Sequence, residues 1–331
     1  MSVISNWMEA LQTTNLAPGV EADPISRWLI LSRASVLPMT LFAGAVGGLL
    51  ALPGGGARLD LWALCTLGLL LAHVSNNLIN DHFDLRSGLD TPDYARAQYA
   101  PHPVLSGMIS PRGLVVAIVV VTALGALIAL GLTWVRGWTA AAFALGGFAI
   151  SFFYVAPPLR LKHRGLGEPA VFVVWGPLMI AGTYFVTTGE LPSWVWWASL
   201  PYGLLVMTVL FGKHIDKLDS DRSRGIRTLP VRLGAVHARR TAQGLIATFF
   251  LGTLALVATG VLGLWTLVVL GALPRALEVG RVFSRPAPPA PPEGYPIWPL
   301  WYVAWAFVLI RRAGSLLVVG LALNALRPLY L

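Results

Sequence analysis

The sequence contains few charged residues and a single cysteine. Asp, Glu, Lys and Arg make up only 12% of its 331 residues, whereas a soluble domain carries about 25%. Hydrophobic residues make up 56%, so a water-soluble globular protein is excluded and a membrane protein is predicted. Because Cys65 is the only cysteine, no internal disulfide can form, and cysteine usage does not indicate a redox compartment.

The chain also has little that resembles a leader or a linker. Residues 1–26 contain three acidic residues and lack a basic stretch followed by an apolar core, so they predict a cytoplasmic segment rather than a cleaved signal peptide. Residues 284–296 (SRPAPPAPPEGYP) are interpreted as an extended, proline-rich spacer. With no other linker, residues 1–331 are expected to form one membrane domain.

Long runs without charged residues predict membrane-spanning helices. The run 241–274 has 34 residues, about 51 Å as one helix, which is too long for a hydrocarbon core of about 30 Å. We therefore expect a break near Gly260. The class predicted is all-α, a bundle of about nine transmembrane helices, or eight if the last run lies in the interface. The runs are 34–52, 61–79, 114–135, 138–159, 169–189, 191–212, the two halves of 241–274, and 305–326.

The distribution of basic residues predicts the orientation. With nine spans, 21 of the 24 Lys and Arg residues fall on one face, and the other face keeps Arg58, Arg136 and Arg327. The positive-inside rule then gives an N-in, C-out topology in the cytoplasmic (inner) membrane. The net charge of +9 lies in loops between spans, so it favours anionic lipid or phosphate as partner and not nucleic acid.

The segment 77–90 (NLINDHFDLRSGLD) is expected to place carboxylates and amides at the membrane boundary. Carboxylates are costly there, and together with amide oxygens they are ligands that Mg²⁺ takes along with substrate phosphates. The spacing predicts one helical face that carries His73, Asn77, Asn80 and Asp84, with Asp81 turned about 100° away. Asp90 follows a break at Gly88 and could supply a third oxygen. Helix capping explains one or two of these residues, but not five polar oxygen donors within the fourteen positions 77–90.

A second cluster, 213–229, follows the sixth run on the same face. Asp216 and Asp219 can share a helix face, and Asp221 lies nearer the side of Lys217. Lys and Arg residues between acids suit a diphosphate held by both metal and cations. A topology signal alone would supply Lys and Arg, but not three aspartates.

A third loop, 154–168, is basic. Arg160, Lys162 and Arg164 could complete an anion site, although pure topology signals would look the same. Arg33 is interpreted as a snorkelling residue at the interface. An allylic cation could be stabilised by nearby aromatic faces, namely Phe152, Phe153, Tyr154, Trp175 and Tyr184.

These stretches resemble the UbiA superfamily of intramembrane prenyltransferases, and within it the 1,4-dihydroxy-2-naphthoate prenyltransferases of menaquinone biosynthesis. The similarity covers roughly residues 30–280, through 77–90, 104–113, 154–168 with 182–189, and 218–234. It implies a central cavity and Mg²⁺-dependent transfer of a polyprenyl group from polyprenyl diphosphate to an aromatic acceptor. The site residues implied are Asn80, Asp84, Asp90, Asp216, Asp219 and Asp221 as catalytic residues, with Asn80, Asp84, Asp90 and Asp221 on the metal, and Asn77, Arg86, Lys162, Lys217 and Arg222 for diphosphate.

One departure from that family concerns the second cluster. The menaquinone enzymes typically read Asn-Asn-x-Arg-Asp-x-x-x-Asp, where this chain has Lys213-His214-Ile215-Asp216-Lys217 and then Asp221. Either Asp216 or Asp219 takes over the missing carboxylate, or the fixed charge of Lys217 replaces a metal. The alternatives are a prenyltransferase with another acceptor (hydroxybenzoate, chlorin or haem, sugar phosphate) and a degenerate lipid or quinone carrier. A transporter is disfavoured because its charges would lie within the spans.

Overall fold

The computed structural model describes residues 3–17, 19–89, 91, 101–295 and 297–331. Throughout these residues the regular elements are helical, which confirms the predicted all-α class. In chain order the elements are α1 (Val3–Thr13), α2 (Pro24–Leu31), η1 (Ala34–Val36), α3 (Pro38–Ala51), α4 (Leu59–Arg86), α6 (Pro111–Arg136), α7 (Trp138–Phe153), η2 (Leu161–Arg164), α8 (Gly167–Val173), η3 (Val174–Ala181), α9 (Gly182–Thr188), α10 (Ser193–Asp216), α11 (Leu218–Ser223), α12 (Leu229–Ala258), η4 (Leu264–Ala272), α13 (Leu273–Ser284) and α14 (Tyr302–Leu326).

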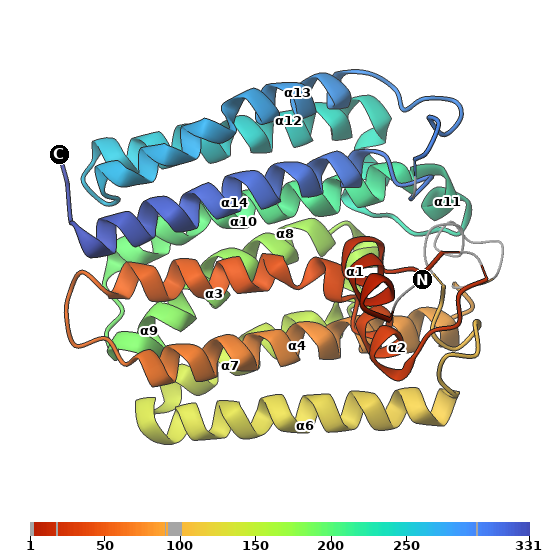
Figure 1. Ribbon diagram of the computed structural model, residues 1–331, viewed down its shortest axis with the longest axis horizontal. Coiled ribbons are helices and arrows are strands. Elements are labelled where there is room, and N and C mark those ends of the chain that lie inside the picture. The colour runs from red at the N-terminus through yellow and green to blue at the C-terminus, as the bar shows by residue number, and fades with distance from the viewer. Residues whose placement is uncertain (1–2, 18, 90, 92–100, 296) are drawn as a thin grey trace.

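Seven helical segments are long and apolar enough to cross a membrane, so the chain is a multi-pass membrane protein. The shorter apolar α7 and the segment formed by η4 and α13 run alongside them (Figure 1). Counting these two would give the predicted nine crossings, and both that number and the N-in, C-out orientation stay predictions. The seven segments are Ala34–Ala51, α4, α6, Gly167–Thr188, α10, α12 and α14.

The predicted break near Gly260 is confirmed. Helix α12 ends at Ala258, and the next element begins at Leu264. Gly260 lies between them with a φ of 72°, in the left-handed region that glycine enters without a steric penalty. The long apolar run therefore folds into two antiparallel segments, α12 and η4–α13 (Figure 1).

Helix α10, which leads into the second cluster, packs closely against the segment of α8, η3 and α9. A Cβ on Gly203 would lie only 3.0 Å from the Cα of Gly176 and 2.8 Å from the carbonyl oxygen of Phe172. Glycine at such a crossing lets two membrane helices approach at backbone distance. Pro177, which has no N–H to donate, lies inside the π-helical stretch η3. This packing fixes α10 in the centre of the bundle.

The elements that carry the predicted site gather at one end of the bundle. Helices α4 and α10 both end there, and α11 and the two N-terminal helices lie at the same end, opposite the C-terminus (Figure 1). Helix α1 crosses the long helices instead of running along them. The first and second clusters, distant in sequence, therefore occupy the same end of the molecule.

Impermeant thiol reagents test the predicted orientation. Cysteines placed at the exposed positions Ser87 and Ser223 are expected to stay unlabelled in intact cells, and cysteines at the exposed positions Gly54 and Glu190 are expected to react. The native Cys65 is buried, so its background labelling should be low. Labelling of Ser223→Cys from outside the cell would invert the proposed topology.

Candidate active site

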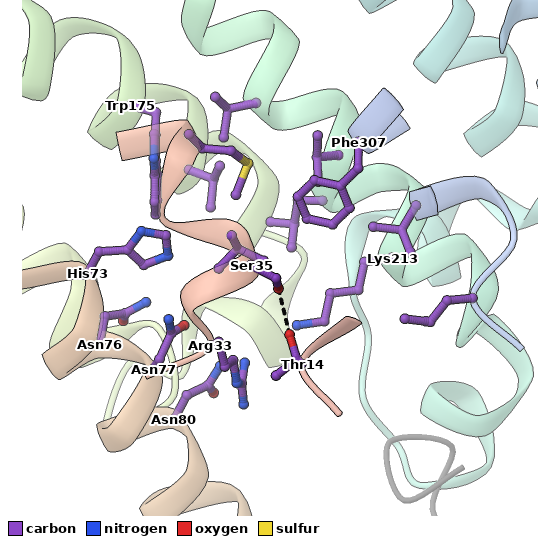
Figure 2. Close-up of a pocket in the computed structure, with 18 of the residues that line it drawn as sticks. Thr14, Arg33, Ser35, His73, Asn76, Asn77, Asn80, Trp175, Lys213 and Phe307 are labelled. Atoms are coloured by element: carbon purple, nitrogen blue, oxygen red, sulfur yellow. Dashed lines mark hydrogen bonds between the residues drawn. The ribbon is translucent and has the colours of Figure 1, made fainter. Parts of the chain in front are cut away.

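A cavity of about 440 Å³ lies among the helices near this end of the bundle (Figure 2). Its walls are mainly apolar side chains of η1, α3, η3, α10 and α14. The end of α1 and residues of the loop before α14 also line it. Its polar groups include Arg33, Lys213, Arg311, hydroxyl groups such as those of Thr14 and Ser35, and a row of α4 side chains, namely His73, Asn76, Asn77 and Asn80.

The α4 side chains lie on one buried face, as the spacing predicts. His73 shares a hydrogen bond of 2.8 Å between its Nδ1 and Thr40 Oγ1, and its ring meets Trp175 edge-on. The amide of Asn77 donates to the carbonyl oxygen of Ser32 at 3.0 Å. Asn80 Oδ1 is buried and accepts no hydrogen bond within the described part of the chain. A buried amide oxygen without a donor is available to a ligand.

Asp84, one turn beyond Asn80, is paired with the third loop. The ammonium of Lys162 in η2 lies 2.7 Å from Asp84 Oδ2, and both side chains are almost fully buried. Burial, together with the neighbouring Lys162 charge, lowers the pKa of His163 to about 4. The His163 imidazole is therefore neutral at pH 7 and adds no positive charge beside this pair.

Hydrogen bonds join the three loops directly. Arg224 of the second cluster donates through Nη1 to the Leu89 carbonyl oxygen at 2.6 Å, and through Nη2 to Thr91 Oγ1 at 2.9 Å. The backbone N–H of Arg227 donates to the carbonyl oxygen of His163 at 3.2 Å. The segment 77–90, the second cluster and the third loop thus meet in the fold.

The three aspartates of the second cluster lie in different surroundings. Asp221 is fully buried, with the Lys217 ammonium 3.4 Å from its Oδ1. Asp219 is 95% exposed and lies 3.9 Å from Arg222. Asp216 accepts the backbone N–H groups of Tyr302 and Val303 at 2.8 and 2.9 Å, which makes it a cap for α14. Only Asp221 therefore shares the buried environment of Asp84.

The remaining site residues predicted from the sequence are Arg86, Arg222 and Asp90. Arg86 and Arg222 are exposed, at the rim of the loop assembly. Asp90 lies outside the described residues. Within those residues, no group of three or more His, Cys, Asp or Glu side chains is arranged to hold a metal. A metal site here would therefore depend on amide oxygens such as that of Asn80 as well as on carboxylates.

Comparison with known proteins identifies the family. The profile of the UbiA prenyltransferase family matches residues 39–293. This chain belongs to that family. It is 31% identical to the 1,4-dihydroxy-2-naphthoate octaprenyltransferase of Escherichia coli (strain K12), over 79% of this chain and 86% of that one. It is 25% identical to the 2-carboxy-1,4-naphthoquinone phytyltransferase of Synechocystis sp., over 83% and 89%.

Solved structures share the fold. A UbiA homologue from Aeropyrum pernix K1 superposes with a TM-score of 0.66 at 18% identity, covering 86% of this chain and 98% of that one. A homologue from Archaeoglobus fulgidus, solved bound to GPP and Mg²⁺, gives 0.62 at 16% identity over 88% and 99%. The family match and the curated relatives make the protein a UbiA-family prenyltransferase, and these structures show that it has the same fold.

Two cavity residues of this prenyltransferase escape prediction from the sequence. The interpretation of Arg33 as a snorkelling residue is wrong, because its guanidinium forms a buried ion pair with Asp81 and lines the cavity. Asp81 and Arg33 are 48 residues apart, so no local pattern reveals the pair. Lys213, which also lines the cavity, reads in the sequence as one more basic residue of the second cluster.

The aromatic residues proposed to face an allylic cation differ in their positions relative to the cavity. Tyr154 and Trp175 line the cavity, and the indole Nε1 of Trp175 is buried without a hydrogen-bond acceptor in the described residues. Tyr184 packs edge-on against Trp194, and Phe152 packs against Phe83. Periodicity places all of them near the membrane interior, but it does not tell which ring faces the cavity.

Asp216 and Asp219 form a matched pair for a stability test. Asp216→Ala removes the acceptor for two backbone N–H groups at the start of α14, and loss of a cap costs about 0.5–2 kcal/mol. We expect a lower Tm in detergent for Asp216→Ala, a smaller drop for Asp216→Asn, and none for the exposed Asp219→Ala. Equal Tm values for Asp216→Ala and Asp219→Ala would contradict the capping role.

Proposed function

We propose that this prenyltransferase moves a polyprenyl group from polyprenyl diphosphate to 1,4-dihydroxy-2-naphthoate, at the cytoplasmic side of the inner membrane. The observation that carries the proposal is the buried Asp84–Lys162 pair, one helical turn beyond Asn80, which lines a mostly apolar cavity. Charged groups at this place suit a diphosphate, and apolar walls suit a lipid chain and a ring. The names of the relatives support the acceptor.

The residues present fit Mg²⁺. Asn80 Oδ1 is a buried oxygen that accepts no hydrogen bond from the described residues, and Asp84 and Asp221 add buried carboxylates. Such hard oxygens, with a diphosphate, match the usual surroundings of Mg²⁺. We propose Asn80, Asp84, Asp90 and Asp221 as its ligands. When bound, the ion would neutralise charge that develops on the leaving diphosphate.

The basic residues have a separate role in the proposal. Lys162 and Lys217 are buried cations whose partners are carboxylates, so they can turn toward phosphate oxygens without first giving up contact with water. Arg86 and Arg222, at the exposed rim, would attract the diphosphate. Asn77 holds the backbone at Ser32, and so keeps the cavity wall in place beside the diphosphate.

The apolar part of the cavity would exclude water from the allylic cation left when diphosphate departs. Tyr154 and Trp175 line this part, and aromatic faces stabilise a cation within about 6 Å. The acceptor ring would attack the cation carbon and form the new carbon–carbon bond, and the proton lost from the ring restores its aromaticity. The diphosphate released in the same reaction is a base that can accept this proton.

An acceptor panel tests the proposed function. Purified protein with Mg²⁺ and a polyprenyl diphosphate is offered 1,4-dihydroxy-2-naphthoate, 4-hydroxybenzoate and a sugar phosphate in separate reactions. We expect prenylated product from the naphthoate, at a rate well above that from the other acceptors. Preferential prenylation of hydroxybenzoate or a sugar phosphate would overturn the proposed acceptor and leave the prenyltransferase itself intact.

Substitution of Lys217 tests how this chain functions without the carboxylate that is missing from its second cluster. If the Lys217 ammonium contacts the diphosphate, Lys217→Ala removes a charge-assisted contact of about 1.5–3 kcal/mol, which weakens diphosphate binding about tenfold or more. Lys217→Arg keeps the charge and is the control. Calorimetric titration with Mg²⁺ and a non-hydrolysable prenyl diphosphate gives the Kd, and an unchanged Kd in Lys217→Ala would exclude this role.

A further inference from the structure

Lys213 is a basic residue of the cavity wall without an acidic partner. It projects from α10 into the cavity, toward Ser35 and Thr14, across from the α4 amides (Figure 2). Within the described residues, no hydrogen bond or ion pair is formed by its ammonium. The menaquinone-enzyme pattern given above has an asparagine at this position, so the charge is a feature of this chain.

Three other cations at or beside the cavity are each paired with an acid, whereas Arg311, which also lines it, is exposed and donates to the Ser35 carbonyl oxygen at 3.5 Å. Lys162 is paired with Asp84, Lys217 with Asp221 and Arg33 with Asp81. A cation in a membrane-embedded cavity is costly unless an anion accompanies it, and such residues mark functional sites by default. An anionic ligand in this cavity would therefore supply the charge that stabilises the ammonium form of Lys213.

The surroundings of Lys213 fit a small anion carried by an apolar body. Val209, Leu210 and Phe307 line the cavity together with Lys213. Lys213 precedes Lys217 by one helical turn, about 6 Å along α10, on the side away from the loops. The diphosphate already has Lys162 and Lys217 at the loop end, so a single ammonium one turn deeper suits a single carboxylate on a ring.

We propose that Lys213 binds the carboxylate of an aromatic acceptor and so selects carboxylated rings over uncharged ones. The inference rests on the proposed function and deepens it. An ammonium and a carboxylate in an apolar cavity form a charge-assisted hydrogen bond, stronger than its equivalent in water. Lys213 thus holds and orients the acceptor, and the reacting carbon of the ring lies away from it.

Two acceptors that differ only in the carboxylate test the proposal. Steady-state kinetics with 1,4-dihydroxy-2-naphthoate and with 1,4-dihydroxynaphthalene are compared in wild type, Lys213→Met and Lys213→Arg. Lys213→Met is expected to raise KM for the naphthoate about tenfold or more and to leave KM for the uncharged acceptor unchanged. Lys213→Arg, which keeps the charge, should retain most of the naphthoate affinity.

Other outcomes overturn the assignment. A rise in KM for polyprenyl diphosphate with both acceptors would mean that Lys213 contacts the diphosphate. Equal losses with both acceptors would mean a purely structural role. Calorimetric titration of 1-hydroxy-2-naphthoate needs no turnover, so it separates this inference from the proposed function. Weaker binding to Lys213→Met than to wild type supports the inference even if no transfer occurs, and equal binding defeats it.

Discussion

Replacing Asp84 with alanine is expected to lower the rate of prenyl transfer about a thousandfold or more, on the order of 4 kcal/mol in the activation barrier. Asp84 is the buried carboxylate one turn beyond Asn80, and it holds Lys162 at 2.7 Å. The substitution removes a proposed metal ligand. It also leaves the Lys162 ammonium without the carboxylate that holds it near the proposed diphosphate position. The measurement is the rate of prenylated product formation by purified protein at saturating substrates.

The same substitution also lowers stability, and a second variant separates the two effects. Asp84→Ala leaves the Lys162 ammonium buried without its acid, which costs about 3–5 kcal/mol when a buried pair is broken. Asp84→Ala combined with Lys162→Met removes both charges and should recover much of the Tm, while activity stays lost. Recovery of activity in the double variant would show that Asp84 serves only to neutralise Lys162.

Removal of divalent metal is expected to abolish turnover. With Asn80, Asp84 and Asp221 as hard oxygen donors, transfer should stop in excess EDTA and return when Mg²⁺ or Mn²⁺ is added. The Tm without substrate should change little, because Lys162 and Lys217 already compensate the two carboxylates. Full activity in excess EDTA would exclude a metal-dependent mechanism.

Asn80 provides a graded form of this test. Asn80→Ala removes one neutral oxygen and no charge, so the variant should still work at high Mg²⁺ concentration. We expect the half-saturating Mg²⁺ concentration to rise about tenfold, corresponding to the loss of about 1.4 kcal/mol. Asn324→Ala, at a buried asparagine near the C-terminal end of α14 and far from the cavity, is the matched control. An unchanged Mg²⁺ requirement in Asn80→Ala would remove Asn80 from the metal site.

Local patterns in the sequence predict those parts of the fold that depend on helical periodicity and on the distribution of polar residues. The absence of charge in the long runs predicts the helices, and the spacing from His73 to Asp84 predicts the face that lines the cavity and meets Lys162. The excess length of the run 241–274 predicts the turn at Gly260. Each of these features follows from interactions between neighbours along one helix or between a helix and the bilayer.

Contacts between segments that are distant in the sequence cannot be predicted from such local patterns. Asp216 carries the same charge and lies in the same cluster as Asp221, yet it caps α14, 86 residues further along the chain. His214 pairs with Glu168 in α8 at 2.6 Å, whereas its neighbour Lys213 faces the cavity. Tyr295, at the end of the segment interpreted as a spacer, lines the cavity as well. Such contacts depend on which helices become neighbours, which the periodicity of one segment does not specify.

The central claim is that diphosphate release and prenylation of an aromatic ring occur together in this cavity. Both products can be followed in one reaction, with diphosphate measured by a coupled assay and the prenylated ring by mass spectrometry. We expect equal amounts of the two products, dependent on Mg²⁺ and absent in Asp84→Ala. A wild-type protein that binds Mg²⁺ and prenyl diphosphate but forms neither product with any acceptor would contradict it, and would indicate a lipid or quinone carrier.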